Sequence, residues 1–142
     1  MANTILVPID GSEPSRNALT VAIEEFDDAE LILLHVIEPY NVFSVTEDAV
    51  RDDDILEERR SERAALLEEF AETAVDMGAD VRTELMLGSP SRAIVDACEE
   101  FDVDHVVMGS RGRTGLSRMI LGSVADTVVK RAPVTVTVVR SD

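Results

Sequence analysis

Short runs of aliphatic residues alternate with longer amphipathic segments from one end of the chain to the other. Runs rich in Ile, Leu and Val predict strands at 4–9, 31–37, 81–87, 105–109 and 134–139. Three of these runs are almost wholly apolar, which is typical of parallel strands that helices cover on both faces. Segments with apolar residues three or four apart separate the runs. The alternation predicts an α/β fold with an open five-stranded parallel sheet and helices on both of its faces.

Capping and stop signals place the ends of the predicted helices. Ser12 is suited to cap the first helix, and Ser89 followed by Pro90 is suited to open the third. The second helix fits residues 55–77 and stops at Gly78, since glycine adopts the left-handed conformation easily. The apolar face of this second helix is predicted to contain Ala64, Leu67, Phe70, Ala71, Ala74 and Met77.

The length and composition fit a single domain. With 142 residues, 45% of them apolar, the chain is long enough for one domain with a hydrophobic core. Residues 39–54 lack periodicity and are predicted to form a loop. No apolar run reaches the roughly 18 residues of a membrane helix, and no signal-peptide pattern opens the chain. We therefore expect a cytoplasmic protein, one domain over residues 1–142, with no membrane partner.

The cysteine and the two histidines are predicted to have structural roles. Cys98 has no second cysteine to pair with and lies on the apolar face of a predicted helix, so we expect a buried thiol. His35 and His105 lie in or beside predicted strands, where partial burial and one hydrogen bond each are expected. Their spacing does not match a zinc site, and the sequence predicts no metal ligands.

The charge of the chain is strongly negative and unevenly distributed. There are 29 acidic and 13 basic residues, a net charge of −16, and Lys130 is the only lysine. Repulsion of this size argues against nucleic acid as a partner, and the balance resembles that of proteins from salt-accumulating halophiles, which we take as a hypothesis. Residues 1–104 hold 7 basic and 27 acidic side chains, whereas residues 105–142 hold 6 basic and 2 acidic ones. An anionic ligand is therefore expected at the last quarter of the chain.

The carboxyl ends of the predicted strands are the expected place for a ligand. The first strand ends in Pro8, Ile9 and Asp10, and the fourth ends in Met108 and Gly109. The last predicted helix follows the fourth strand, and its first N–H groups are suited to bind an anion. All of these groups face one crevice if the first and fourth strands are neighbours in the sheet.

A glycine-rich loop joins the fourth predicted strand to the last predicted helix. Gly109, Gly112 and Gly122 are followed by Ser123 in the spacing G-x2-G-x9-G-S. Glycines let backbone N–H groups approach phosphate oxygens, and a serine at a helix start adds a hydroxyl donor. A flexible loop that needs turns is the alternative interpretation. Phosphate binding is favoured because the loop follows a strand, opens a helix and carries positive charge in an acidic chain.

Four segments of the chain together resemble one known family, the universal stress proteins. They are ILVPIDGSEPSRNAL, LILLHVIEP, GSPSRAIVDACEEFDVDHVVMGSRG and GLSRMILGSVADTVVKRAPVTVTVV, and they are spread over the full length. In that family the pattern G-x2-G-x9-G-[ST] marks the branch that binds ATP, and here the pattern is complete. The resemblance implies a Rossmann-like sheet with strand order 3-2-1-4-5. It also implies ATP as the ligand, with Mg2+ or Mn2+ carried by the phosphates.

The resemblance assigns roles to individual residues as well. It implies that backbone N–H groups and a serine hydroxyl hold the phosphates, at Gly112, Gly122, Ser123 and Val124. It implies that the main chain of Val36 meets the adenine edge and that Met108 with Gly109 lies along the ribose. It also implies that Pro8, Ile9 and Asp10 form the opposite wall of the nucleoside site. Asp10 is also suited to approach a metal ion on the phosphates or to cap the first helix. Arg111 and Arg113 either clamp a γ-phosphate or extend into solvent.

The last predicted strand points to a second copy of the chain as a partner. It alternates Val with Thr, as suits an edge strand with one wetter face, and it has no central proline, charge or bulge glycine to block pairing. We therefore expect a homodimer joined near Val136 and Val138. An edge covered by the chain's own loop is the alternative.

A nucleotide-dependent regulatory dimer in the stress response is the favoured function. The Walker A pattern is absent and no motif positions a base against a γ-phosphate, so any hydrolysis is expected to be slow. An adenylate-forming or ATP-hydrolysing α/β enzyme is the enzymatic alternative, although DGSEPS after the first strand lacks the paired glycines of that phosphate loop. Two non-enzymatic functions compete as well: a flavin-binding electron-transfer subunit, whose chain is usually longer, and an interaction dimer without nucleotide.

Overall fold

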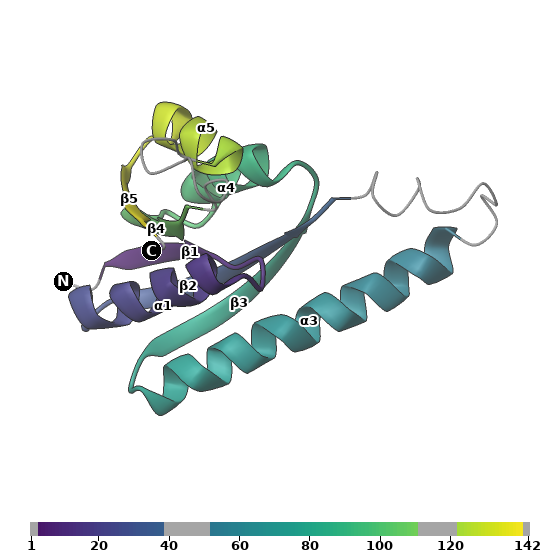
Figure 1. The fold of residues 1–142 in the computed structure, drawn as a ribbon, viewed down its shortest axis with the longest axis horizontal. Coiled ribbons are helices and arrows are strands. Elements are labelled where there is room, and N and C mark those ends of the chain that lie inside the picture. The colour runs from purple at the N-terminus through teal and green to yellow at the C-terminus, as the bar shows by residue number, and fades with distance from the viewer. Residues whose placement is uncertain (1–2, 39–51, 111–121, 141–142) are drawn as a thin grey trace.

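Five parallel strands form one twisted sheet (Figure 1). The structure, a computed structural model, describes residues 3–38, 57–110 and 122–140 and the backbone of 52–56. The strands are β1 (Thr4–Pro8), β2 (Glu30–Ile37), β3 (Asp80–Leu87), β4 (His105–Gly109) and β5 (Thr135–Val139). They pair in the order β3-β2-β1-β4-β5, and every pairing is parallel. The predicted fold class and strand order are confirmed, and each strand end lies within one residue of its prediction.

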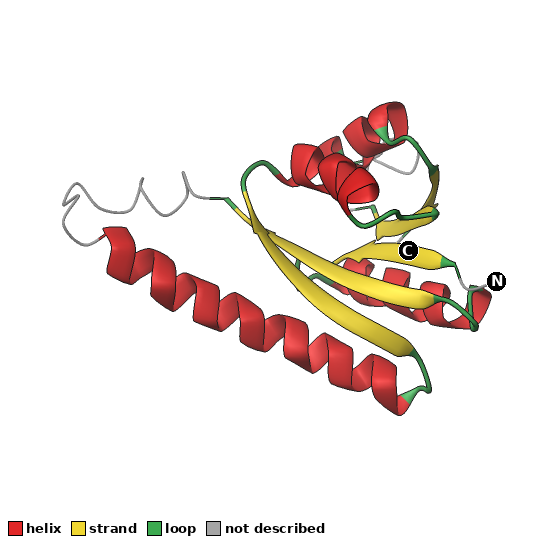
Figure 2. Ribbon diagram, turned by 180° about the vertical axis from the view of Figure 1, so that it is seen from behind, coloured by secondary structure: helices red, strands yellow, loops and turns green. Residues whose placement is uncertain are grey.

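The described helices lie in two layers, one on each face of the sheet (Figure 2). They are α1 (Glu13–Glu25), α3 (Asp52–Asp76), α4 (Pro90–Glu100) and α5 (Ser123–Arg131). α1 and α3 pack on one face, and α4 and α5 pack on the other (Figure 1). The molecule is thus a three-layer α/β fold, in which helices cover both faces of the parallel sheet.

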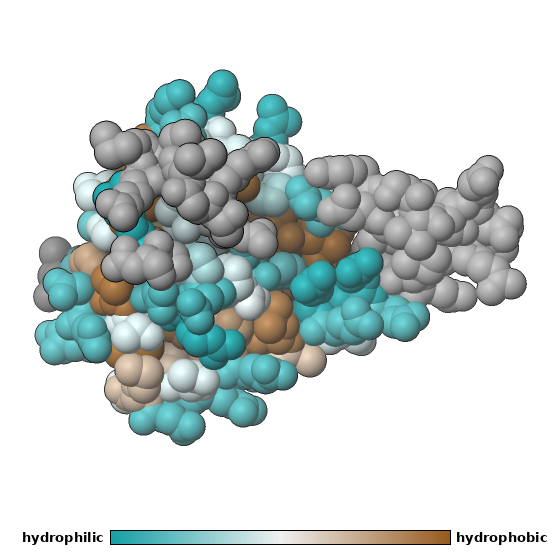
Figure 3. All heavy atoms as spheres, in the orientation of Figure 1, coloured by the Kyte–Doolittle hydropathy of each residue, from teal (hydrophilic) through white to brown (hydrophobic). Residues whose placement is uncertain are grey.

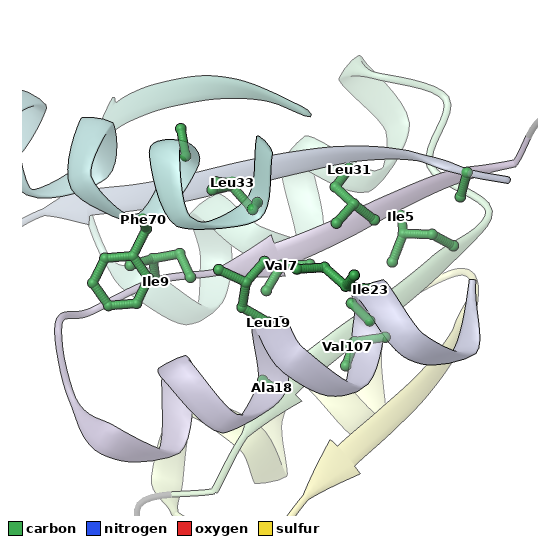
Figure 4. Packing of buried hydrophobic residues seen from close by; sticks show 14 of the residues in the cluster. Ile5, Val7, Ile9, Ala18, Leu19, Ile23, Leu31, Leu33, Phe70 and Val107 are labelled. Atoms are coloured by element: carbon green, nitrogen blue, oxygen red, sulfur yellow. The ribbon is translucent and has the colours of Figure 1, made fainter. Parts of the chain in front are cut away.

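Alternate residues of the strands point into two separate cores. Ile5 and Val7 of β1 pack with α1 and α3, whereas Leu6 between them packs with α4 and α5. In the first core, Phe70 of α3 lies beside Ile9, the residue that follows β1, and belongs to the same cluster as Leu19 of α1 (Figure 4). Burial on both faces is the reason why consecutive residues in the middle of the central strands are apolar, since neither side of the sheet meets water there.

The capping signals are confirmed in position but not all in detail. The Ser12 hydroxyl accepts a hydrogen bond from the backbone N–H of Ser15 at 3.3 Å and caps α1. Gly78 ends the α3 region with a φ of +91°, the left-handed conformation expected of it. Ser89 occupies the cap position of α4, but its side chain makes no capping hydrogen bond. The helix there begins on Pro90, whose fixed φ suits the first turn.

α3 differs from its prediction at both ends. It begins at Asp52, so the prediction of a loop over 39–54 is wrong for its last three residues, while 39–51 lie outside the described residues. Acidic residues at 52–54 favour a helix start through the helix dipole. The predicted apolar face is wrong for Ala64 and Met77, which are exposed. The first half of α3 diverges from the sheet (Figure 1), so its small residues have no strand beneath them.

The thiol and the second imidazole have the structural roles expected of them. Cys98 is buried in the α4 core, and burial raises the pKa of its thiol to about 11. Nε2 of His105 lies 2.7 Å from the Thr137 hydroxyl on the adjacent strand, and burial lowers the pKa of this histidine. None of the helices in the described part of the chain is long and apolar enough to cross a membrane.

Candidate functional site

A cavity of about 480 Å³ lies at the carboxyl ends of β1, β2 and β4. Its volume falls within the range of roughly 300–1,000 Å³ that is usual for small-molecule sites. The strand order reverses between β1 and β4, because the chain continues from β1 outward to β2 and β3 on one side and from β4 to β5 on the other. Open α/β sheets bind ligands at such switch points, where adjacent loops turn to opposite faces of the sheet.

The cavity brings together the predicted site residues that the structure describes. Residues from two strand ends, from β2 and from the start of α5 line it: Pro8, Ile9, Asp10, Val36, Met108, Gly109, Gly122, Ser123 and Val124. The other three predicted residues, Arg111, Gly112 and Arg113, lie outside the described residues. The walls that the sequence assigned to different strands therefore surround one space.

Asp10 acts on the start of α1 through Ser12. Its carboxylate accepts a hydrogen bond from the Ser12 backbone N–H at 2.9 Å and another from the Ser12 hydroxyl. Gly11 between them has a φ of +84°, which closes this tight turn after β1. The residue that caps α1 is Ser12 itself, so Asp10 holds the cap in place rather than forming it. Both side chains face the cavity.

Gly109 is required by the packing of α1 against β4. A Cβ atom at this position would lie 2.5 Å from the backbone carbonyl carbon of Pro14 and 2.8 Å from its Cβ, and would also collide with the carbonyl oxygen. The first turn of α1 therefore touches the end of β4 through a residue without a side chain. This close approach brings the walls from β1 and β4 together at the cavity.

The start of α5 is tied to the ends of β4 and β5 by Ser110. Ser110 is buried, with 8% of the residue exposed, and its hydroxyl accepts a hydrogen bond from the Gly122 N–H at 3.4 Å. The backbone N–H of Ser110 donates to the Val139 carbonyl at 3.0 Å. Gly122 is the cap residue of α5, so the first N–H groups of this helix are held at the cavity. These N–H groups have no partner within the helix and suit an anion.

His35 lies in the wall formed by β2. Its Nδ1 is 2.7 Å from the Ile9 carbonyl, and only 6% of the residue is exposed. Because a carbonyl oxygen only accepts, Nδ1 carries the proton and Nε2 is the acceptor of the neutral ring. Burial lowers the pKa of His35, and this effect and the charge of Arg63 outweigh the hydrogen bond to Ile9 and the charge of Asp10, which raise it. His35 thus extends the contact between β1 and β2 beyond Pro8.

Several residues of the cavity were not predicted from the sequence. Arg59 and Arg63 of α3 line it, as do Pro90 and Ile94 of α4. The four-residue spacing of the two arginines places them on one face of a helix, but the pattern carries no information about which strand end that face meets. Within the described residues, no group of three His, Cys, Asp or Glu side chains is arranged to hold a metal ion.

Comparison with known proteins places the chain among homologues that match it over nearly its whole length. The universal stress protein family matches residues 1–140. The chain is 35% identical over 150 residues to the universal stress protein YxiE of Bacillus subtilis, covering 99% of this chain and 100% of that protein. It is 32% identical over 155 residues to the universal stress protein MJ0577 of Methanocaldococcus jannaschii, covering 99% and 96%.

Solved structures agree with these sequence matches. The structure of MJ0577 superposes with a TM-score of 0.85 at 32% identity and covers 100% of this chain and 98% of that chain. A universal stress protein in complex with cAMP superposes with a TM-score of 0.72 at 26% identity, covering 99% and 98%. The sheet order, the cavity at its switch point and the match over residues 1–140 lead to one conclusion: this chain belongs to the universal stress protein family.

Proposed function

We propose that the cavity binds an adenine nucleotide, with ATP as the ligand that the glycine pattern favours. The observation that carries the proposal is the convergence of β1, β2, β4 and the start of α5 on one space of about 480 Å³. A relative with 26% identity over almost the whole chain was solved in complex with cAMP, also an adenine nucleotide. The G-x2-G-x9-G-S spacing at 109–123 adds the donors that a longer phosphate chain needs.

The ligand would lie along the strand ends. Its phosphates would meet the N–H groups at Gly122, Ser123 and Val124 and those of Gly112, with Arg111 and Arg113 from the same loop beside them. The adenine edge would meet the main chain of Val36, and the ribose would lie along Met108 and Gly109. Pro8, Ile9 and Asp10 would form the opposite wall. Mg2+ or Mn2+ would arrive with the phosphates, since oxygen-rich phosphates are the ligands such ions prefer.

The proposed role is regulatory. Nucleotide occupancy would order the segment between β4 and α5, and a partner would read that order. A cytoplasmic homodimer of single-domain chains, formed through β5 and active in a stress response, is the assembly that we propose. The acidic composition supports a halophilic source. The proposal is for a binding protein with at most slow hydrolysis, because the sequence lacks the Walker A pattern and no motif positions a base against a γ-phosphate.

Titration calorimetry with ATP at molar KCl tests nucleotide binding. The wild-type protein is expected to saturate with ATP. The variant Gly122→Val is expected not to saturate, because the introduced valine side chain would lie among the N–H donors at the start of α5. Val129→Ala is the matched control, since Val129 is an exposed residue of the same helix outside the cavity. A folded wild-type protein that gives neither heat nor saturation would contradict the proposal.

The enzymatic alternative is tested on the same samples. An adenylate-forming or ATP-hydrolysing enzyme would release pyrophosphate or phosphate at a rate above about 1 s⁻¹, the lower end of usual turnover numbers. We expect release far below this rate in wild-type protein that is saturated with ATP. Turnover at enzymatic rates that is lost in Gly122→Val would replace the regulatory proposal with a catalytic one.

A further inference from the structure

Two arginines of α3 face the cavity from the side opposite α5. Arg59 and Arg63 are four residues apart, and both are half-buried and line the cavity. Their helical neighbours Glu58, Arg60 and Glu62 are exposed instead. Because residues four apart share one face of a helix, Arg59 and Arg63 together form the part of α3 that meets the cavity.

These guanidinium groups are unusual in a chain with a net charge of −16. Among the side chains that the structure describes, no carboxylate lies within 4.0 Å of either group, although Lys130 pairs with Asp126 at 3.1 Å and Arg82 with Glu84 at 3.7 Å. The positive charge of Arg63 is also felt inside the cavity, where it contributes to the lowered pKa of His35. Two carboxylates, those of Asp10 and Glu38, also line the cavity, and the two arginines balance their charge. The lining of the cavity is therefore much less negative than the chain as a whole.

We propose that Arg59 and Arg63 bind the anionic part of the ligand and make its affinity increase with the number of phosphate charges. The inference rests on the proposed nucleotide site and adds residues that neither the glycine pattern nor the strand ends contain. The start of α5 would hold the phosphates from one face of the sheet, and the two guanidinium groups would approach them from the other. A nucleoside without phosphate gives these charges nothing to bind.

A physical reason favours such an arrangement in this protein. The carboxylates of the surface repel an approaching polyanion, and every added phosphate increases that repulsion. Paired positive groups inside a partly enclosed cavity act at short range, where salt screens them less than it screens the exposed carboxylates. The preference for the more highly charged nucleotide then depends on the side chains of the cavity and not on the charge of the whole surface.

The test compares ligands that share one nucleoside and differ in the number of phosphate groups. Dissociation constants of ATP, ADP, AMP and adenosine are measured by calorimetry for the wild type, Arg59→Gln, Arg63→Gln and the double variant. Arg60→Gln is the matched control, because it removes the same charge from an exposed position one residue away. We expect each cavity variant to weaken ATP binding about tenfold relative to Arg60→Gln and to change adenosine binding less than twofold.

The outcomes separate this inference from the proposed function. If the wild type binds ATP and the variants Arg59→Gln and Arg63→Gln bind it no more weakly than Arg60→Gln does, the inference is overturned. The proposed nucleotide site is not affected by that result. Equal weakening of ATP and adenosine also overturns the inference, because the arginines would then contact the nucleoside. A wild type that binds none of the four ligands removes the proposed function itself. Far-ultraviolet circular dichroism of every variant ensures that only folded protein is compared.

Discussion

Gly109 has a role in the fold that its place in a phosphate-binding pattern conceals. Its missing side chain lets Pro14 of α1 approach the end of β4, and an added Cβ would meet backbone atoms that have no freedom to rotate away. A loss of ligand binding in a Gly109 variant would therefore report the displacement of α1 as well as the loss of a contact. Gly122 and Ser123 are better probes of the phosphate site for this reason.

Substitution of Gly109 is expected to destabilise the protein without any ligand present. Gly109→Ala should lower the free energy of unfolding by about 1–3 kcal/mol, the usual cost of forcing extra volume into a packed contact. Gly109→Val should lower it further, since the collision with Pro14 grows with side-chain size. Urea denaturation of the nucleotide-free proteins measures both values. A Gly109→Ala protein as stable as the wild type would mean that α1 does not approach β4 so closely.

His35 is expected to make the stability of the protein depend on pH. Its pKa in the folded protein is lowered from 6.5, chiefly by burial, so the unfolded chain binds a proton more readily. The contribution of the neutral His35 to the free energy of unfolding is therefore fully present above about pH 6.5. This contribution is lost as the pH falls from there toward the lowered pKa. His35→Asn retains an N–H donor for the Ile9 carbonyl but does not titrate. Its unfolding free energy should fall less steeply than that of the wild type below pH 6.5.

His105 provides the comparison for this measurement. Its pKa is also lowered by burial, although it is half-buried and lies away from the cavity. Adding His105→Asn to His35→Asn should reduce the slope further, by the contribution of His105, because every other group is the same in the two proteins and cancels in the difference between them. Identical slopes for the wild type and His35→Asn would show that the buried imidazole does not titrate on unfolding in this range.

At the scale of the elements, β5 has the hydrogen-bonding pattern that an added strand requires. The Val139 carbonyl points toward β4, where it accepts from the Ser110 N–H. Alternate residues of a strand direct their backbone groups to opposite sides, so Val136 and Val138 direct theirs toward the open edge of the sheet. Their side chains pack on the α4 and α5 core. Within the described part of the chain no strand pairs with this edge, and its outward backbone groups lie where the sequence predicted a second copy to pair.

A proline at the open edge should separate dimerisation from folding. Val138→Pro removes an N–H that faces outward and leaves the pairing with β4 intact, so we expect a folded protein whose dimer dissociation constant rises at least tenfold. Thr137→Pro is the contrasting variant, because the N–H that it removes faces β4 and its loss should destabilise the sheet. Sedimentation velocity at high salt measures the first effect. A wild type that sediments only as a 15.5 kDa species would contradict the dimer.

The sheet could be predicted from the sequence far better than the longest helix. Burial on both faces leaves an unbroken apolar run at 5–7 in β1 and at 106–108 in β4, and such runs can be recognised in the sequence. The start of α3 at Asp52 and the exposure of Ala64 depend instead on how far the helix diverges from the sheet, which no local pattern encodes. The same holds for Arg59 and Arg63, since their place in the cavity is a property of tertiary packing.

At the scale of the whole molecule, the negative charge sets the conditions under which the fold is stable. Hydrophilic side chains occupy much of the periphery of the face in Figure 3, with hydrophobic ones gathered nearer its middle. With 29 acidic residues against 13 basic ones, most carboxylates have no cation to pair with. Their mutual repulsion is smaller in the expanded unfolded chain than in the folded one, so it lowers the free energy of unfolding. Salt is expected to remove this penalty.

The dependence on salt distinguishes screening from a surface that is merely polar. The Debye length falls from about 10 Å at 0.1 M to about 3 Å at 1 M, so repulsion between separate surface carboxylates is largely removed over that interval. Thermal unfolding midpoints should therefore rise most steeply below 1 M KCl and less steeply above it. Choline chloride should give the same curve if screening is the cause, because any monovalent salt screens equally at equal ionic strength. A midpoint that stays flat from low to molar KCl would contradict the halophilic interpretation of the acidic surface.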